Sequence, residues 1–257
     1  MVTAIDIARY LDELLGTTSV PDYPGALNGL QLDHKGPVRG IAASVDVSLR
    51  GLEAAISADA NLLLVHHGLF WGGIQRLVGV SYQRLKLLCS HDIAVYSSHL
   101  PLDAHDSLGN NALLASAFDL EPTGRFVHFQ NVPIGLSGAS DIPTSDLVER
   151  VRHALLPWGG TVTATRHDHT RITRTWGICS GAGASSETLR EAVTLGVDTL
   201  IVGEGPHHTA VEAVDLGLVV IYAGHYATET LGVQAIARKA ADHFGLPWSF
   251  VHVPSGL

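Results

Sequence analysis

Short apolar runs alternate with segments of helical periodicity along this chain, and the alternation predicts an α/β fold. Residues 41–46 and 62–65 have the length and aliphatic composition of buried strands. Between them, residues 48–58 place apolar side chains at helical spacing. A strand, a helix and a second strand in this order are typical of parallel strands joined by helices.

The same order of elements returns later in the chain at a nearly constant offset. A shift of 137 residues aligns Val65 with Val202. A shift of 126 residues aligns His99 with His225, and the difference of 11 residues falls around 72–79 in the first half. Two matched blocks in the same order indicate an internal duplication.

We therefore expect two similar α/β lobes with mixed sheets, related by internal duplication. The first lobe is predicted to span residues 1–125 and the second to span residues 126–257. Either lobe is long enough to bury its own core.

Several further elements follow from periodicity and from helix or turn signals. Predicted helices occupy residues 3–15, 81–90, 144–156 and 230–244. Predicted β-type stretches occupy residues 93–96, 160–165, 171–176 and 249–253. Prolines and glycines in residues 21–32 predict a loop there.

Composition narrows the functional classes. Hydrophobic residues make up 46% of the chain and charged residues 16%, as in ordinary globular proteins. No apolar run approaches the roughly 20 residues that span a bilayer, and no basic leader precedes one, so we expect a cytoplasmic protein without membrane association. The formal net charge of -9 and the absence of a Lys/Arg cluster argue against a nucleic-acid partner.

Histidines follow several predicted strands at the point where each strand ends. His66 and His67 come directly after the strand at 62–65, and His99 and His225 follow the next strand of each half. In open α/β sheets, active centres form beyond the carboxyl ends of the strands. A shared position of this kind favours a function over simple packing.

Carboxylates accompany two of these histidines. His225 and Glu229 are four residues apart at the start of a predicted helix, so both side chains can reach one ion. His99 and Asp103 have the same spacing, but Pro101 between them predicts a loop rather than a regular helix.

Imidazole and carboxylate ligands suit zinc, iron or manganese. Cys89 and Cys179 lie far apart in the sequence, so they predict neither a disulfide framework nor a cysteine-rich zinc site. Two divalent ions about 3.5–4 Å apart would lower the pKa of bound water and provide a nucleophile. We expect the metal site to lie between the two lobes, and the expected chemistry is hydrolysis by metal-activated water.

Four motifs in this order resemble one protein family over nearly the whole chain. They are the segments 28–31 (Asn-Gly-Leu-Gln), 66–68 (His-His-Gly), 98–103 (Ser-His-Leu-Pro-Leu-Asp) and 224–229 (Gly-His-Tyr-Ala-Thr-Glu). The chain is similar to the hexameric proteins with a dinuclear metal centre known as GTP cyclohydrolase 1 type 2 homologues.

The resemblance implies two divalent metal ions per chain and a toroidal homohexamer whose metal pairs face an interior cavity. The implied metal ligands are His66, His67, Asp103, His225 and Glu229. His99 matches a position near the metals, where it would contact substrate or act as an acid or base. Glu204 and His208 match a second strand-end motif less closely, and Glu204 is expected at most to support a ligand.

The family name implies a small-molecule substrate and points to opening of the guanine ring of GTP with release of formate. Two alternatives stay open: a non-enzymatic metal-binding protein that forms rings, and a metal-dependent phosphoesterase. Outside the motifs, ordinary surface or hydrogen-bonded roles are expected for the remaining histidines, which are His34, His91, His105, His128, His153, His167, His169, His243 and His252.

Overall fold

The computed structural model describes residues 1–73, 75–166 and 168–257, and it groups the chain into two compact units. Unit 1 comprises residues 1–102 and 232–253, and unit 2 comprises residues 103–231 and 254–257. The units differ from the predicted lobes because residues 103–125 belong to unit 2 and most of the C-terminal segment belongs to unit 1. The placement of a metal site between the lobes stays a prediction.

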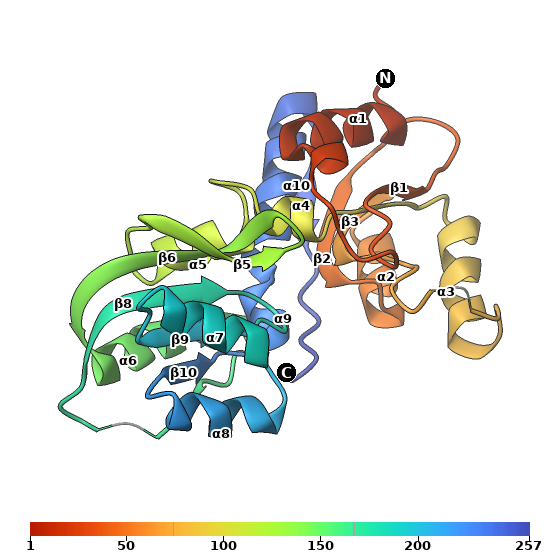
Figure 1. Ribbon diagram of the computed structural model, residues 1–257. Helices are drawn as coiled ribbons and strands as arrows, with labels where there is room; N and C mark the ends of the chain where they lie inside the picture. Colours follow the sequence, from red (N-terminus) through yellow and green to blue (C-terminus); the bar gives the residue numbers. More distant parts are fainter. Residues whose placement is uncertain (74, 167) are drawn as a thin grey trace. The chain divides into compact units, whose positions relative to one another are not determined.

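Unit 1 is built on a five-stranded mixed sheet of order β1-β4-β3-β2-β11. Strands β2, β3, β4 and β11 run parallel, and β1 pairs antiparallel with β4. Its elements, most of them labelled in Figure 1, are α1 (Ala4–Leu15), η1 (Thr17–Ser19), β1 (Gly29–Leu32), β2 (Ile41–Asp46), α2 (Leu49–Ser57), β3 (Leu62–His67), α3 (Gly79–Ser90), β4 (Ala94–Ser97), α4 (Leu100–Asp103), α10 (Thr230–Phe244) and β11 (Trp248–Phe250).

Both faces of this sheet are covered, which explains its apolar strands. Leu63 and Val65 of β3 pack in one core cluster with residues of α2 and α3. On the opposite face, the Tyr96 hydroxyl of β4 donates a hydrogen bond of 2.9 Å to Asp12 of α1. Alternate side chains of a strand point to opposite faces, so burial on both sides requires nearly continuous apolar sequence.

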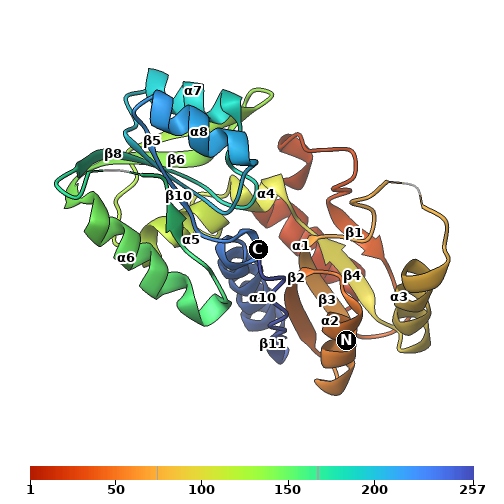
Figure 2. The same cartoon turned by 90° about the horizontal axis from the view of Figure 1, so that it is seen from below.

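Unit 2 contains a six-stranded mixed sheet of order β5-β6-β8-β9-β10-β7. Figure 2 shows α7 and α8 on one side of this sheet and α5 and α6 on the other. The elements are α5 (Asn110–Ala117), β5 (Gly124–Phe129), β6 (Val132–Pro143), α6 (Thr144–Leu155), η2 (Leu156–Trp158), β7 (Thr163–Ala164), β8 (Ile172–Cys179), α7 (Ser186–Thr194), β9 (Thr199–Val202), α8 (His207–Asp215), β10 (Val219–Tyr222) and α9 (His225–Thr228).

The predicted fold class is confirmed: the protein is α/β with two mixed sheets, and the order of elements repeats. Strands β2, β3 and β4 are adjacent and parallel, as are β8, β9 and β10. Helix α7 lies 137 residues after α2 at both ends. Ser48 and Ser185 cap these helices in the same way, each accepting from the backbone N–H three residues later.

The second sequence offset needs correction. Val65 pairs with Ser97 in unit 1, and Val202 pairs with Tyr222 in unit 2, so β10 lies 125 residues after β4 rather than 126. Two residues separate strand and helix in both halves, but His99 is the residue before α4, whereas His225 is the first residue of α9. His99 therefore lies two residues after the end of β4, whereas His225 lies three residues after the end of β10.

Other differences concern strands with weak sequence patterns. The predicted loop at 21–32 contains β1, and the long antiparallel pair β5 and β6 has no predicted counterpart. Strands β1 and β5 lie at sheet edges, and all three strands are partly exposed, so they lack the continuous apolar runs of β2 and β3. Strand β3 also extends through His67, so His66 and His67 are its last two residues rather than the first residues after it.

Among the described residues, no helix is both long enough and apolar enough to cross a membrane.

We predict that the two serine caps contribute equally to stability. Ser185→Ala and Ser48→Ala each remove an oxygen that accepts a hydrogen bond of 3.0 Å from the backbone, so each should lower the free energy of unfolding by about 0.5–2 kcal/mol. Urea unfolding followed by circular dichroism measures this. Ser57→Ala, which alters a serine inside α2, is the control and should change stability by less than about 0.5 kcal/mol. Loss of stability in only one cap variant would contradict the equivalence.

Candidate metal-binding site

Three imidazole rings gather at the carboxyl ends of β3 and β4 in unit 1. One nitrogen from each of His66, His67 and His99 lies within 4.8 Å of one nitrogen of the other two. The ring centroids of His66 and His67 are 4.8 Å apart, and those of His66 and His99 are 4.9 Å apart. His66 and His99 are buried, and His67 is partly exposed. We call these residues the three-histidine cluster.

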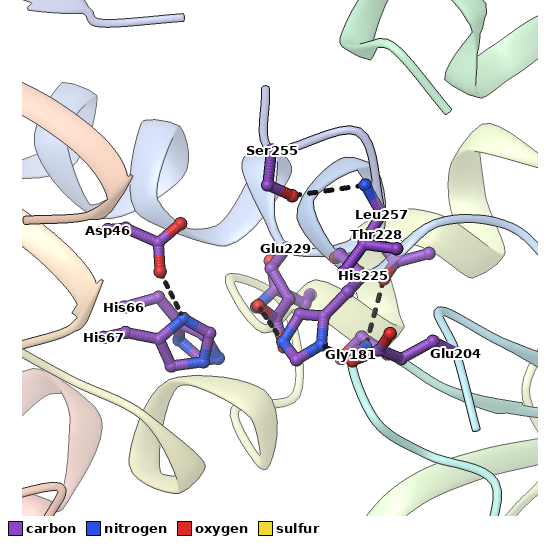
Figure 3. Close-up of polar contacts among 12 residues, drawn as sticks. Asp46, His66, His67, Gly181, Glu204, His225, Thr228, Glu229, Ser255 and Leu257 are labelled. Atoms are coloured by element: carbon purple, nitrogen blue, oxygen red, sulfur yellow. Dashed lines mark hydrogen bonds and ion pairs between the residues drawn. The ribbon is translucent and has the colours of Figure 1, made fainter. Parts of the chain in front are cut away.

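Each ring of the cluster donates its Nδ1 proton to an oxygen. His66 Nδ1 lies 2.9 Å from the carbonyl oxygen of Ser98, which can only accept. His67 Nδ1 lies 2.9 Å from a carboxylate oxygen of Asp46, as Figure 3 shows. Because Nδ1 carries the proton, the neutral ring has its lone pair on Nε2. Hydrogen bonds of this kind orient the histidine ligands of metal sites.

Asp22, whose side chain is only 6% exposed, does the same for His99 from the segment between η1 and β1. Its Oδ1 accepts from His99 Nδ1 at 2.8 Å, and its Oδ2 accepts from the side chain of Asn28 and the backbone of Leu100, both at 2.8 Å. Burial acts to raise the pKa of Asp22, but these hydrogen bonds and the charge of His99 outweigh burial and lower it. Asn28 also accepts from the His99 backbone N–H at 2.8 Å. Asp22 therefore stays ionised and fixes the ring.

In unit 2, His225 lies between two glutamates. Its Nδ1 is 2.7 Å from Glu204 and its Nε2 is 3.1 Å from Glu229 (Figure 3). Burial lowers the pKa of His225, but the hydrogen bonds to Glu229 and Glu204 and their charges outweigh burial and raise the pKa to about 9. Both ring nitrogens face carboxylate oxygens, so the metal-free ring is an imidazolium. A metal ion at Nε2 would displace a proton.

Asp103 and Glu229 belong to the same neighbourhood of unit 2. Asp103 accepts from Asn110 at 2.8 Å and from the hydroxyl of Ser180 at 3.4 Å. Burial raises the pKa of the Cys179 thiol above its usual range, and the charges of Asp103 and Glu229 add to this effect. Two buried carboxylates in one place favour a cation between them.

Gly181 makes room for the Glu229 side chain. It has φ of +60°, and a Cβ at this position would lie 2.0 Å from Glu229 Oε1. Its backbone N–H donates to the hydroxyl of Thr228 at 3.0 Å (Figure 3). Only glycine combines this backbone conformation with this close approach.

The structure thus brings the three-histidine cluster together in unit 1, and places Asp103, His225 and Glu229 among supporting groups in unit 2. The assignment of these residues as metal ligands, and of His99 as catalytic, stays a prediction. Glu204 supports His225, while His208 is exposed in α8. The sequence did not identify Asp22 and Asp46 as partners of the histidines. The only signals were that Asp22 lies near the 28–31 motif and that Asp46 ends a strand.

The other histidines have varied surroundings. His128 contacts Glu191 at 2.7 Å, His34 contacts Asn61 at 3.2 Å, and His243 stacks on Tyr10. These contacts agree with ordinary structural roles. His167 lies outside the described residues.

Comparisons with known proteins cover almost the whole chain. A model of the Duf34/NIF3 family, described as NGG1p interacting factor 3, matches residues 2–255. A Deinococcus radiodurans protein named GTP cyclohydrolase 1 type 2 homolog is 39% identical over 259 residues, which cover 98% of this chain and 94% of that protein.

Solved structures agree with these matches. The structure of the protein ybgI, described as of unknown function, has a TM-score of 0.89 and 30% identity, with all of both chains covered. The structure of TTHA1606 from Thermus thermophilus has a TM-score of 0.80 and 33% identity, again with both chains covered completely.

We predict that His225 is protonated at neutral pH in the metal-free protein. Its pKa is raised from an ordinary value of 6.5 to about 9, so its stabilising contribution is complete below pH 6.5 and is lost as pH rises through 9. An NMR titration of the ring measures the pKa. Glu204→Gln should lower it, and Glu53→Gln, at an exposed position of α2, should not. A pKa at or below 6.5 in the wild-type protein would contradict this view.

Proposed function

The chain belongs to the Duf34/NIF3 family, and from this membership together with its histidine and carboxylate clusters we propose that it is a metal-dependent hydrolase. The family resemblance given by the four motifs is confirmed. The activity, the number of ions and the substrate are the parts that we propose.

The observation that carries the proposal is the shared orientation of the three-histidine cluster. The Nδ1 proton of each ring is directed at an oxygen acceptor, and one nitrogen of each ring lies within 4.8 Å of the others. Zn–N bonds are about 2.0–2.1 Å long, so the His66 and His67 rings can reach bound ions after small side-chain shifts, with His99 beside them. Ordinary packing does not require three imidazoles to converge in this way.

We propose that two divalent ions bind to each chain. The proposed ligands are His66, His67, Asp103, His225 and Glu229. Nitrogen and oxygen donors without thiolates suit zinc, iron or manganese. When bound, such ions would polarise water and make it nucleophilic at neutral pH.

The proposed role of His99 is to carry a proton at Nε2. Asp22 Oδ1 lies 2.8 Å from His99 Nδ1 and accepts its proton, so Nε2, on the other side of the ring, points away from Asp22. A ring fixed in this tautomer can accept a proton at Nε2 and return it to a leaving group. Asp22 is therefore proposed to position His99.

The proposed reaction is opening of the guanine ring of GTP. Relatives carry the name GTP cyclohydrolase 1 type 2 homolog, which supports this substrate for the present chain. One water would add to the carbon that lies between the two nitrogens of the imidazole ring and open the ring to a formamide. A second water would hydrolyse the formamide, so that this carbon leaves as formate and its nitrogen remains as an amine. The toroidal homohexamer implied by the motifs is part of the same proposal.

We predict about two equivalents of divalent metal per chain by elemental analysis of the purified protein. His66→Ala and Glu229→Ala should each lower the metal content sharply, because each removes a proposed ligand. His91→Ala and Glu53→Ala are matched controls at exposed positions and should retain the metal. A wild-type protein that is folded but takes up no zinc, iron or manganese would overturn the metal proposal.

We predict that the metal-loaded protein releases formate from GTP, measured with a coupled formate assay. His99→Gln should lower kcat about 10²- to 10⁴-fold, as expected when a general acid or base is removed, while metal content stays at the wild-type level. Loss of metal from this variant would instead identify His99 as a ligand.

Assays on a panel of nucleotides, phosphoesters and pterin precursors distinguish the guanine-ring reaction from the two alternatives, a phosphoesterase and a non-enzymatic metal-binding protein. A wild-type protein that leaves GTP intact but hydrolyses a phosphoester contradicts the guanine-ring reaction and supports a phosphoesterase. A metal-loaded protein that is inactive on nucleotides, phosphoesters and pterin precursors supports a non-enzymatic metal-binding role.

A further inference from the structure

Two exposed aromatic rings lie beside the three-histidine cluster in unit 1. Trp71 contacts His99 edge to face, with ring centroids 4.6 Å apart, and lies 5.1 Å from the ring of His67. Tyr23 lies 6.2 Å from Trp71 and 6.0 Å from His99. We call Tyr23 and Trp71 the aromatic wall.

The wall joins two segments that are far apart in the sequence, and Gln31 of β1 holds them together. The Gln31 amide group donates to the carbonyl oxygens of Ala26 and Leu27 at 2.9 and 3.0 Å, and it accepts from the backbone N–H of Leu69 at 2.7 Å. One side chain thus connects the segment after Tyr23 to the segment before Trp71. This contact gives Gln31 of the 28–31 motif a role that the metal centre does not explain.

The two segments also approach each other closely through their backbones. A Cβ at Gly25 would lie 2.7 Å from the carbonyl oxygen of Trp71, so a larger residue would force the segments apart. The rings of the wall are therefore presented from a supported backbone and not from independent loops.

Exposure distinguishes the wall from ordinary core packing. Tyr23 is 51% exposed and Trp71 is 43% exposed, although both touch histidines of the cluster. Large apolar rings left in water beside polar groups are typical of ligand-binding sites. Each ring keeps accessible surface on which a flat ligand can stack.

We propose that the aromatic wall is a binding subsite for a planar heteroaromatic ring, which stacks on Trp71 next to His99. A purine base and a pterin share this chemistry. The wall would position the ring relative to the His99 imidazole, so Trp71 would determine which substrates are accepted. This inference rests on the proposed function only for the placement of the metal beside the wall.

Equilibrium binding tests the inference without relying on turnover. Isothermal titration calorimetry of the metal-loaded full chain would compare guanosine 5′-monophosphate, neopterin and ribose 5-phosphate, which lacks a base. We expect at least one ring-containing probe to bind more tightly than ribose 5-phosphate. Trp71→Ala should weaken binding of that probe by roughly 5- to 150-fold, the range measured for loss of base stacking.

Matched variants separate stacking from other effects. Trp71→Phe keeps a flat ring and should retain most of the affinity, and Tyr23→Leu should weaken binding if Trp71→Ala fails to fold. Tyr82→Ala alters an exposed aromatic residue of α3 and should leave binding unchanged. None of these variants should change the metal content.

Three outcomes would overturn the inference. They are failure of the wild-type protein to bind either ring-containing probe, equal affinity in wild type and Trp71→Ala, and loss of metal on Trp71→Ala, which would make the ring a shield for the histidines. Ring binding without formate release would leave the inference standing while the proposed reaction fails. Metal-dependent hydrolysis of a substrate without a ring, together with no binding of either ring-containing probe, would overturn the inference and leave the proposed hydrolase activity standing.

Discussion

The hydrogen bond at Nδ1 is the interaction on which the candidate site depends. His66, His67, His99 and His225 all use it, and the acceptors are one backbone carbonyl and three carboxylates. A free imidazole can place its proton on either nitrogen and can rotate about two bonds. An oxygen fixed at 2.7–2.9 Å from Nδ1 removes both freedoms, so the direction of Nε2 is set by the surrounding fold.

Each acceptor is far in the sequence from the histidine that it contacts, so the sequence predicts the histidines but not their partners. Helix α10 was predicted at residues 230–244 and is observed there, because local periodicity and end signals specify a helix. The histidines at strand ends were also identifiable, since parallel strands end at one edge of a sheet. Asp22 could not be assigned to His99 in the same way, because 77 residues separate them and only the folded chain brings them together.

The sequence also failed to predict the partly exposed strands β5 and β6 and the exact position of His225 relative to its strand. Strands β5 and β6 pair mainly with each other and with β8, and their partly exposed side chains give no continuous apolar run. An alignment of the two halves by sequence matches His99 with His225 because the residues are identical. Sheet pairing shows that one residue more separates His225 from its strand, which a comparison of sequences alone does not reveal.

The two repeated halves differ at Gly181, where the Glu229 side chain fills the space that a Cβ would occupy. By sheet pairing, Gly181 takes the place of Asp46 beside β3, and Gly203 takes the place of His66 in the strand itself. The second half therefore has no side chains at two places where the first half has polar ones, and Glu229 Oε1 lies within 2.0 Å of where one of them would begin. Any side chain introduced at Gly181 would have to displace the Glu229 carboxylate, so the second half can hold Glu229 in this place only while position 181 is glycine.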